Sequence, residues 1–320
     1  MTMQVRRPVV GIDVAKDELV IHQDDSKHPL MIENSPAAIR QWLAHLPTEC
    51  DIAIEATSTY HMEVTERAHA RGHQVYVIDG YRLKNYREGV GGRAKTDVTD
   101  AQLLARYLSK EKEELRQWTP PPKAYRLLQS LLRRRAALVK ARTALRQSLG
   151  GEPVLKHILQ STIKQMDRID RLIQQYLGAA LKAAGLSADV QRCRAIDGVG
   201  DITAAALVMA FLRGDFRNSD AFIAFLGLDV RVRDSGKSRG KRKLTKKGDS
   251  EVRRLLHCAA MSASRQPTWA AFYQRYRERG LKTTQALVIL ARKIARVAFT
   301  LMKRQEQYCP AMLFETCRAP

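Results

Sequence analysis

The sequence has few aromatic residues and no long hydrophobic run that is free of charge. Aromatic residues make up 6% of its 320 positions. The most apolar C-terminal stretch, residues 286–302, contains Arg292, Lys293 and Arg296, which make insertion into a bilayer costly. The apolar run at residues 9–14 is broken by Asp13 and is not typical of a secretion signal. We therefore expect an intracellular, cytoplasmic protein with no membrane partner.

Cysteine is also scarce, and its spacing argues against the common zinc motifs. The five cysteines include no CxxC pair. Structural zinc sites usually draw on closely spaced pairs of this kind. We expect free thiols in a reducing compartment and no structural zinc.

Acidic residues are in short supply after residue 110. Residues 1–110 hold 14 Lys and Arg against 15 Asp and Glu, whereas the remaining 210 residues hold 41 against 18. The net charge of +22 therefore arises outside the first third of the chain. Such a surface favours a polyanionic partner, and nucleic acid is favoured over a membrane because no long basic amphipathic helix carries exposed aromatic residues. A basic surface without a partner is the alternative.

The first 110 residues alternate between strand and helix patterns. Strands are predicted by short apolar runs, and helices by longer amphipathic segments. The predicted strands are residues 8–13, 18–23, 30–34, 51–56 and 73–79, and the predicted helices are 37–46, 62–72 and 101–110. Three strands followed by alternating helix and strand predict a mixed sheet flanked by helices.

The rest of the chain is predicted to be helical. Three prolines, Pro120 to Pro122, mark a boundary, because proline cannot continue a helix interior. Two long helices follow, and each has apolar residues at heptad spacing. In the first these are Leu128, Leu131, Leu138, Leu145 and Leu149, interrupted by Arg135 and Arg142; in the second they are Leu155, Leu159, Thr162, Met166, Ile169, Ile173 and Tyr176. The seams suit a coiled-coil hairpin, an oligomer contact or two helices of an ordinary bundle.

Four acidic residues are predicted to lie at the ends of elements in the first part of the chain. Asp13 and Glu55 close two strands, and Asp97 and Asp100 open a helix. Acids at the ends of adjacent strands converge at one edge of a sheet, and the helix adds two more. Four carboxylates suit Mg²⁺ or Mn²⁺. The alternative for each helix residue alone is structural, with Asp100 as an N-cap and Asp97 as a turn residue.

A second candidate site is the basic segment RVRDSGKSRGKRKLTKKG, residues 231–248. It has nine Lys and Arg between Arg231 and Lys247 and one acid, Asp234, so it must be solvated or neutralised by phosphates. Ser235 and Ser238 lie inside it. Either is a candidate nucleophile, although the segment supplies no base. The alternative is a nucleic-acid tether with incidental serines. Its candidate backbone contacts are Lys237, Arg239, Lys241, Arg242, Lys243, Lys246 and Lys247.

A third candidate is the glycine pair in IDGVGDITA. Gly198 and Gly200 precede a predicted helix that starts near Asp201. Exposed backbone N–H groups at such a helix start bind phosphate without reading base sequence. The pattern is similar to a helix-hairpin-helix, and a tight turn between helices is the alternative.

Together these motifs resemble one family over residues 9–303. GIDVAK, IEATSTY, KTDVTDAQLLA, IDGVGDITA, FIAFLGL and DSGKSRG…KKG…VRRLL occur in the order seen in DEDD transposases of bacterial insertion sequences, a group that includes Piv-type DNA invertases. The resemblance implies an α/β plus all-α chain. A RuvC-type (RNase H-like) catalytic domain would span residues 1–118, coiled-coil helices 119–188 and a helical transposase domain 189–320.

The resemblance also implies residue roles and a mechanism. Asp13, Glu55, Asp97 and Asp100 would be the catalytic, metal-binding acids, and Ser235 the nucleophile, with Ser238 as its rival. The metal domain of one protomer and the serine domain of another would form a composite site in a homo-oligomer, a dimer or tetramer. The serine would form a covalent phosphoserine link to donor or target DNA, guided by a structured bridge RNA.

Two other functions remain open from the sequence. One is a metal-dependent endonuclease of the Holliday-junction type, in which water attacks and the basic segment only grips DNA. The other is a non-catalytic nucleic-acid-binding scaffold, against which the placement of the four acids argues.

Overall fold

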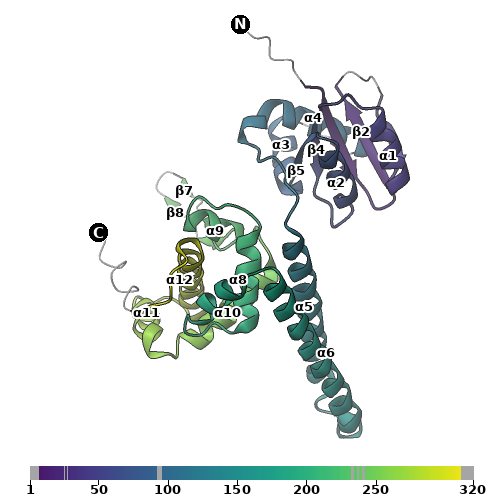
Figure 1. Cartoon of the computed structure of the whole chain (residues 1–320). Coiled ribbons are helices and arrows are strands. Elements are labelled where there is room, and N and C mark those ends of the chain that lie inside the picture. The colour runs from purple at the N-terminus through teal and green to yellow at the C-terminus, as the bar shows by residue number, and fades with distance from the viewer. Residues whose placement is uncertain are drawn as a thin grey trace. The chain divides into compact units, whose positions relative to one another are not determined.

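The computed structural model describes residues 7–310 except 25, 27, 92–95, 232–233, 236–237 and 240–241, and it describes only the backbone of 234, 235, 238 and 239. The chain forms two compact units, Met1–Pro120 and Pro121–Pro320, so the division falls inside the run of three prolines (Figure 1). Among the described residues, no helix has the length and apolar character that crossing a membrane requires.

A five-stranded mixed sheet forms the frame of the first unit. Its strand order is β3-β2-β1-β4-β5; β1, β2 and β3 are antiparallel neighbours, and β4 and β5 continue in parallel from β1. The strands are β1 (Val9–Val14), β2 (Glu18–Gln23), β3 (Leu30–Glu33), β4 (Asp51–Glu55) and β5 (Gln74–Ile78). The mixed sheet predicted from the sequence is confirmed.

Strand side chains point alternately to the two faces of this sheet, so apolar residues lie on both faces and helices cover both. Val10 and Ile12 of β1 belong to one apolar cluster together with residues of the first two helices, whereas Val9 belongs to a second cluster with residues of the next two. The helices are α1 (Pro36–Ala44), α2 (Met62–Ala70), α3 (Gly80–Gly89) and α4 (Asp97–Glu111), the last followed by the short turn η1 (Lys112–Glu114). Burial on both faces explains why β1, β4 and β5 read as continuous apolar runs, whereas β3 at the sheet edge is largely exposed.

Helix α3 was missed by the sequence prediction. It begins at Gly80 and is capped by Asp79, whose carboxylate accepts hydrogen bonds from the backbone N–H groups of Tyr81 and Arg82. Its buried residue is Leu83. A helix with so little buried apolar surface lacks the 3.6-residue periodicity on which the prediction depended.

The second unit is helical, as predicted, apart from two short strand pairs. Helix α8 is apolar on all sides and lies in the core, where residues of α5, α6, α9, α10 and α12 surround it. The helices are α5 (Lys123–Leu149), α6 (Lys156–Ala183, after the turn η2, Pro153–Leu155), α7 (Ser187–Arg194), α8 (Asp201–Leu212), α9 (Ser219–Phe225), α10 (Ser250–Ala263), α11 (Pro267–Glu278) and α12 (Thr283–Arg304).

Helices α5 and α6 form a hairpin (Figure 1). In α6 the buried residues are Ile163, Asp170, Leu177 and Leu181, whereas Ile169 and Tyr176 of the predicted seam are half exposed. An oligomer contact through that seam stays a prediction. The arginines that interrupt the α5 pattern pair with α6. Arg135 Nε lies 2.8 Å from Asp170 Oδ1, and Arg142 contacts Asp167. These ion pairs satisfy charges that a purely apolar seam would leave unpaired.

The hairpin shares its base with the rest of the second unit. Leu128 and Leu132 of α5 and Leu177 and Leu181 of α6 belong to the same apolar cluster as α8. The separate coiled-coil domain at residues 119–188 stays a prediction.

Candidate active site

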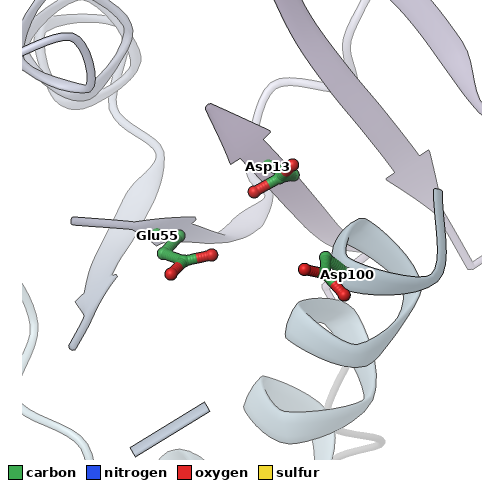
Figure 2. A group of neighbouring side chains, drawn as sticks. All are labelled: Asp13, Glu55 and Asp100. Carbon is green, nitrogen blue, oxygen red and sulfur yellow. The ribbon is translucent and has the colours of Figure 1, made fainter. Parts of the chain in front are cut away.

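Three of the four predicted acids converge at one edge of the sheet. Asp13 lies near the end of β1, and Glu55 ends β4. These strands are parallel neighbours, paired from Val9↔Asp51 to Ile12↔Ile54, so their carboxyl ends meet. Asp100 comes from the first turn of α4 and points toward the other two (Figure 2). We call Asp13, Glu55 and Asp100 the acidic cluster.

Close packing of α4 on β1 brings Asp100 to the cluster. A Cβ added at Gly11 would lie 2.0 Å from the backbone oxygen of Ala101, so only glycine permits this approach. Thr96 caps the helix: its hydroxyl accepts a hydrogen bond from the Thr99 backbone N–H. Asp100 is therefore not the N-cap that the structural alternative proposed, and its carboxylate is buried.

The cluster has the donor set of a site for a hard cation. One carboxylate oxygen from each residue lies within 4.8 Å of the others. Burial, followed by the charges of Glu55, Asp100 and Asp97, raises the pKa of the Asp13 carboxyl from 3.8 to about 7. Three carboxylates held this closely repel one another unless a proton or a cation joins them. Oxygen ligands of this kind suit Mg²⁺, Mn²⁺ or Ca²⁺.

Asp97 is not part of this cluster of three. It is the first residue of α4 and is exposed. It is nevertheless close enough for its charge to contribute to the raised pKa of Asp13. The role of Asp97 as a fourth metal ligand stays a prediction.

Helix α3 adds two residues that the sequence prediction missed. Arg87 forms an ion pair with Asp100, and both side chains are largely buried. At the other end of the helix, a Cβ added at Gly80 would lie 2.6 Å from Oε1 of Glu55. The available signal was the Asp79-Gly80 helix start directly after a strand, which places a new helix beside the strand ends.

The serine-bearing segment is held firmly at its base. Strand β6 (Val230–Arg231) pairs with β9 (Lys243–Leu244). The Thr245 hydroxyl donates to the Asp229 carboxylate, and the backbone N–H of Lys246 donates to the Gly227 oxygen over 3.1 Å. We call residues 229–247 the serine loop.

Two glycines allow the ends of the serine loop to meet. Gly227 has φ +68°, and a Cβ there would lie 2.7 Å from the Lys247 nitrogen. A Cβ at Gly248 would lie 2.4 Å from the Phe225 oxygen. The guanidinium of Arg253 donates to the backbone oxygens of Leu226 and Gly248, which ties both ends to α10.

Ser235 and Ser238 are backbone partners in a second short strand pair. β7 (Asp234–Ser235) pairs with β8 (Ser238–Arg239), in the register Ser235↔Ser238. The connecting residues, Lys237 among them, and Lys241 lie outside the described residues. Arg239 is described by its backbone alone. The other predicted contacts, Arg242, Lys243, Lys246 and Lys247, are exposed.

The glycine pair before α8 has an evident structural role at its first position. Gly198 has φ +90°, and a Cβ there would lie 2.6 Å from the Ala263 nitrogen of α10. Gly200 is exposed and is the N-cap of α8, with no atom within 4 Å of an added Cβ. Packing therefore accounts for Gly198. Phosphate binding by this turn stays a prediction.

Family models and relatives match most of the chain. A DEDD transposase model matches residues 10–158, which contain all four acids. The model of the transposase IS116/IS110/IS902 family matches residues 190–274, which contain the glycine pair and the serine loop.

Two relatives match nearly the whole length of the chain, and a third matches about two thirds of it. The pilin gene-inverting protein of Moraxella bovis is 26% identical over 315 residues, covering 93% of this chain and 97% of its own. A probable family 20 transposase of Pseudomonas aeruginosa is 26% identical, covering 94% and 98%. The transposase for insertion sequence element IS1111A of Coxiella burnetii is 27% identical, covering 67% and 68%. With both parts matched by transposase models, this chain belongs to the DEDD transposase family and is an enzyme that transposes or recombines DNA.

Proposed function

We propose that this enzyme cuts and rejoins donor and target DNA through a covalent link between Ser235 and a DNA phosphate, assisted by a divalent cation at the acidic cluster. The observation that carries the proposal is the convergence of Asp13, Glu55 and Asp100 at one sheet edge. Membership of the family implies dependence on a divalent metal. A RuvC-like fold for the first unit is part of the proposal, and the mixed sheet with helices on both faces supports it.

The residues of the cluster fit such a cation. Their carboxylate oxygens are close together, and the pKa of Asp13 is raised first by burial and then by neighbouring negative charge, which a cation would offset. Asp97, at the same helix start, would complete the set. A bound Mg²⁺ or Mn²⁺ would stabilise negative charge that develops on the phosphate.

Ser235 would perform the transfer. Its Oγ loses a proton and forms a bond to phosphorus, while the bond from phosphorus to the 3′ oxygen breaks. The 3′ oxygen takes a proton and leaves as a free 3′-OH, and the 5′ phosphate stays on the serine. The serine loop contributes cations that stabilise the added negative charge, and carboxylates of the acidic cluster would receive the serine proton.

The partners of the reaction include more than one nucleic acid and a second copy of the chain. The net charge of +23 after residue 110 supports extensive phosphate contact, by DNA and by a structured bridge RNA. Helix α6 leaves Ile158, Ile169, Leu172 and Tyr176 about half exposed. Such an apolar stripe supports a homo-oligomer, a dimer or tetramer, in which one copy supplies the acids and another the serine.

A trapping experiment tests the proposal. The protein is purified with its cognate non-coding RNA, incubated with labelled donor and target DNA and Mg²⁺, and denatured before electrophoresis. We expect label on the wild-type protein and on Ser238→Ala, the matched control from the opposite strand of the hairpin. Label should be lost in Ser235→Ala and Asp13→Ala. DNA cleavage without an adduct, unaffected by Ser235→Ala, would instead indicate a junction-type endonuclease that uses water.

A further inference from the structure

Arg87 occupies a position that the proposed reaction does not explain. It lies in the last turn of α3, and its Nη2 contacts Oδ1 of Asp100. The Arg87 side chain is 14% exposed and that of Asp100 is 6% exposed. A buried carboxylate of the acidic cluster is thus already neutralised by a residue of the chain itself.

The contact uses only part of the guanidinium. Its Nε is buried and makes no hydrogen bond within the described part of the chain. A permanent structural arginine usually binds a carboxylate through two parallel hydrogen bonds, and a buried unsatisfied N–H is costly. The Arg87 contact is therefore weaker than the burial of the two groups would allow.

Helix α3 packs on the sheet through a narrow apolar face. Leu83 is its buried apolar residue, Tyr86 packs edge-to-face against Tyr107 of α4 with ring centroids 4.7 Å apart, and Gly89 ends the helix. At its start, Gly80 rests against the Glu55 carboxylate. The helix thus lies against the cluster at two points, Glu55 and Asp100, and Arg87 is held beside Asp100 by the packing of the helix.

The geometry points to Arg87 as a resident counter-ion of Asp100 that a divalent cation displaces. This inference rests on the proposed metal site. A guanidinium and a divalent cation compete for the same carboxylate charge, because each lowers the cost of keeping Asp100 ionised in a buried place. Arg87 stabilises the metal-free fold and holds the metal affinity below the value that the acids alone would give.

The competition predicts opposite effects on the two states when the charge of Arg87 is removed. Without metal, Arg87→Ala leaves a buried carboxylate unpaired and lowers the melting temperature. With metal, the same change removes the competitor. An opposite charge at contact distance shifts carboxylate equilibria by about one to three tenfold steps, so we expect Mn²⁺ to bind at least about tenfold more tightly.

The experiment is a calorimetric Mn²⁺ titration of the full-length protein without nucleic acid, with melting temperatures measured in chelator and in Mn²⁺. Arg87→Gln is run beside Arg87→Ala, because glutamine keeps a hydrogen-bond donor for Asp100 and supports folding if alanine does not. Arg82→Ala, an exposed arginine of the same helix, is the matched control and should behave as wild type. Tighter Mn²⁺ binding and a larger Mn²⁺-induced rise in melting temperature in the Arg87 variants support the inference.

The titration distinguishes failure of the proposed metal site from failure of the counter-ion role of Arg87. If the wild type binds no Mn²⁺, or Asp13→Ala binds it equally well, the proposed metal site is wrong. If the wild type binds Mn²⁺ through Asp13 but Arg87→Gln binds it with equal or lower affinity, the site stands and the counter-ion role is overturned.

Discussion

The acidic cluster of the first unit and the serine loop of the second hold charges of opposite sign, and the fold holds them by different means. Asp13 and Glu55 are fixed by strands inside a sheet with apolar clusters on both faces. The serine loop is fixed at its two ends by a short strand pair and by Gly227 and Gly248, and its basic side chains that the structure describes are exposed.

The difference indicates what kind of partner each region can bind. The cluster is held together by core packing in spite of repulsion, so its partner has to be small enough to reach a partly buried site: a proton, an arginine or a metal ion. The basic side chains of the loop that the structure describes are exposed to solvent, so they suit an extended polyanion as a partner. Changes in core packing should therefore affect the cluster, and changes at the base should affect the loop.

The largest effect is expected at Gly11. Gly11→Ala forces a Cβ into the backbone of α4, and neither the strand nor the helix can move cheaply. We expect the first unit to lose about 3 kcal/mol, the upper end for overpacking of a core. Urea denaturation followed by circular dichroism measures it. Gly89→Ala, which meets no atom within 4 Å and has an ordinary φ, is the control and should be close to neutral. An equally stable Gly11→Ala protein would contradict the described packing.

The next effect concerns pH. The pKa of Asp13 is about 7 in the folded protein against 3.8 for the free group, owing first to burial and then to neighbouring carboxylates. Its contribution to stability is therefore full below pH 3.8 and is lost as the pH rises to about 7. We expect the metal-free wild type to lose melting temperature over this window relative to Asp13→Asn. Parallel curves for the two proteins would refute the raised pKa.

The same proton opposes metal binding. Because a cation must displace it, the Mn²⁺ affinity should fall by about tenfold for each pH unit below about 7 and level off above it. Titrations at several pH values measure this slope. An affinity that does not change between pH 5 and 8 would contradict the expectation.

A smaller effect is expected at the base of the serine loop. Gly248→Ala places a Cβ 2.4 Å from the Phe225 oxygen, so the two ends must separate. We expect a loss of about 1–2 kcal/mol in the second unit together with loss of covalent DNA trapping. Gly178→Ala on α6, with no atom within 4 Å, is the control and should keep full activity. Normal trapping by Gly248→Ala would show that the loop works without a fixed base.

The smallest effect is expected from one exposed cation. Lys243→Ala on β9 should weaken nucleic-acid binding only slightly and reduce the salt dependence of the logarithm of the affinity by about one unit. Filter binding over a series of salt concentrations measures the slope. Lys110→Ala, an exposed lysine of the near-neutral first unit, should leave it unchanged. Equal slopes for all three proteins would remove Lys243 from the interface.

The sequence predicted the features that depend on neighbours along the chain. Asp13 and Glu55 could be found because each ends an apolar run, and parallel strand ends meet. Asp100 could be found because α4 begins beside them. Arg87 could not be found, because its partner is reached only when α3, a helix with weak periodicity, is folded back over the strand ends.

The α6 seam shows a second limit. Apolar residues of α6 form two neighbouring heptad stripes: the one through Ile169 is regular enough to be noticed in the sequence, whereas the one through Ile163 is the buried one. The buried stripe contains Asp170, and an acidic residue argues against burial unless it is paired. Its partner is Arg135 of the facing helix α5. An ion pair between two helices of a hairpin cannot be predicted from the sequence of either helix alone.

The base of the serine loop also limits how far Ser235, the proposed nucleophile, can reach. Ser235 is four residues beyond Arg231, the last residue of β6, and an extended chain advances about 3.5 Å per residue. The Cα of Ser235 therefore lies within about 14 Å of the Cα of Arg231 in any conformation that keeps the β6–β9 pair. The segment from Arg231 to Ser235 thus sets a maximum distance between Ser235 and the base of the loop. Ser235 can reach a phosphate farther away than this only when the whole second unit moves. The position of the helical unit on DNA, and not motion of the loop, would then control when the serine attacks.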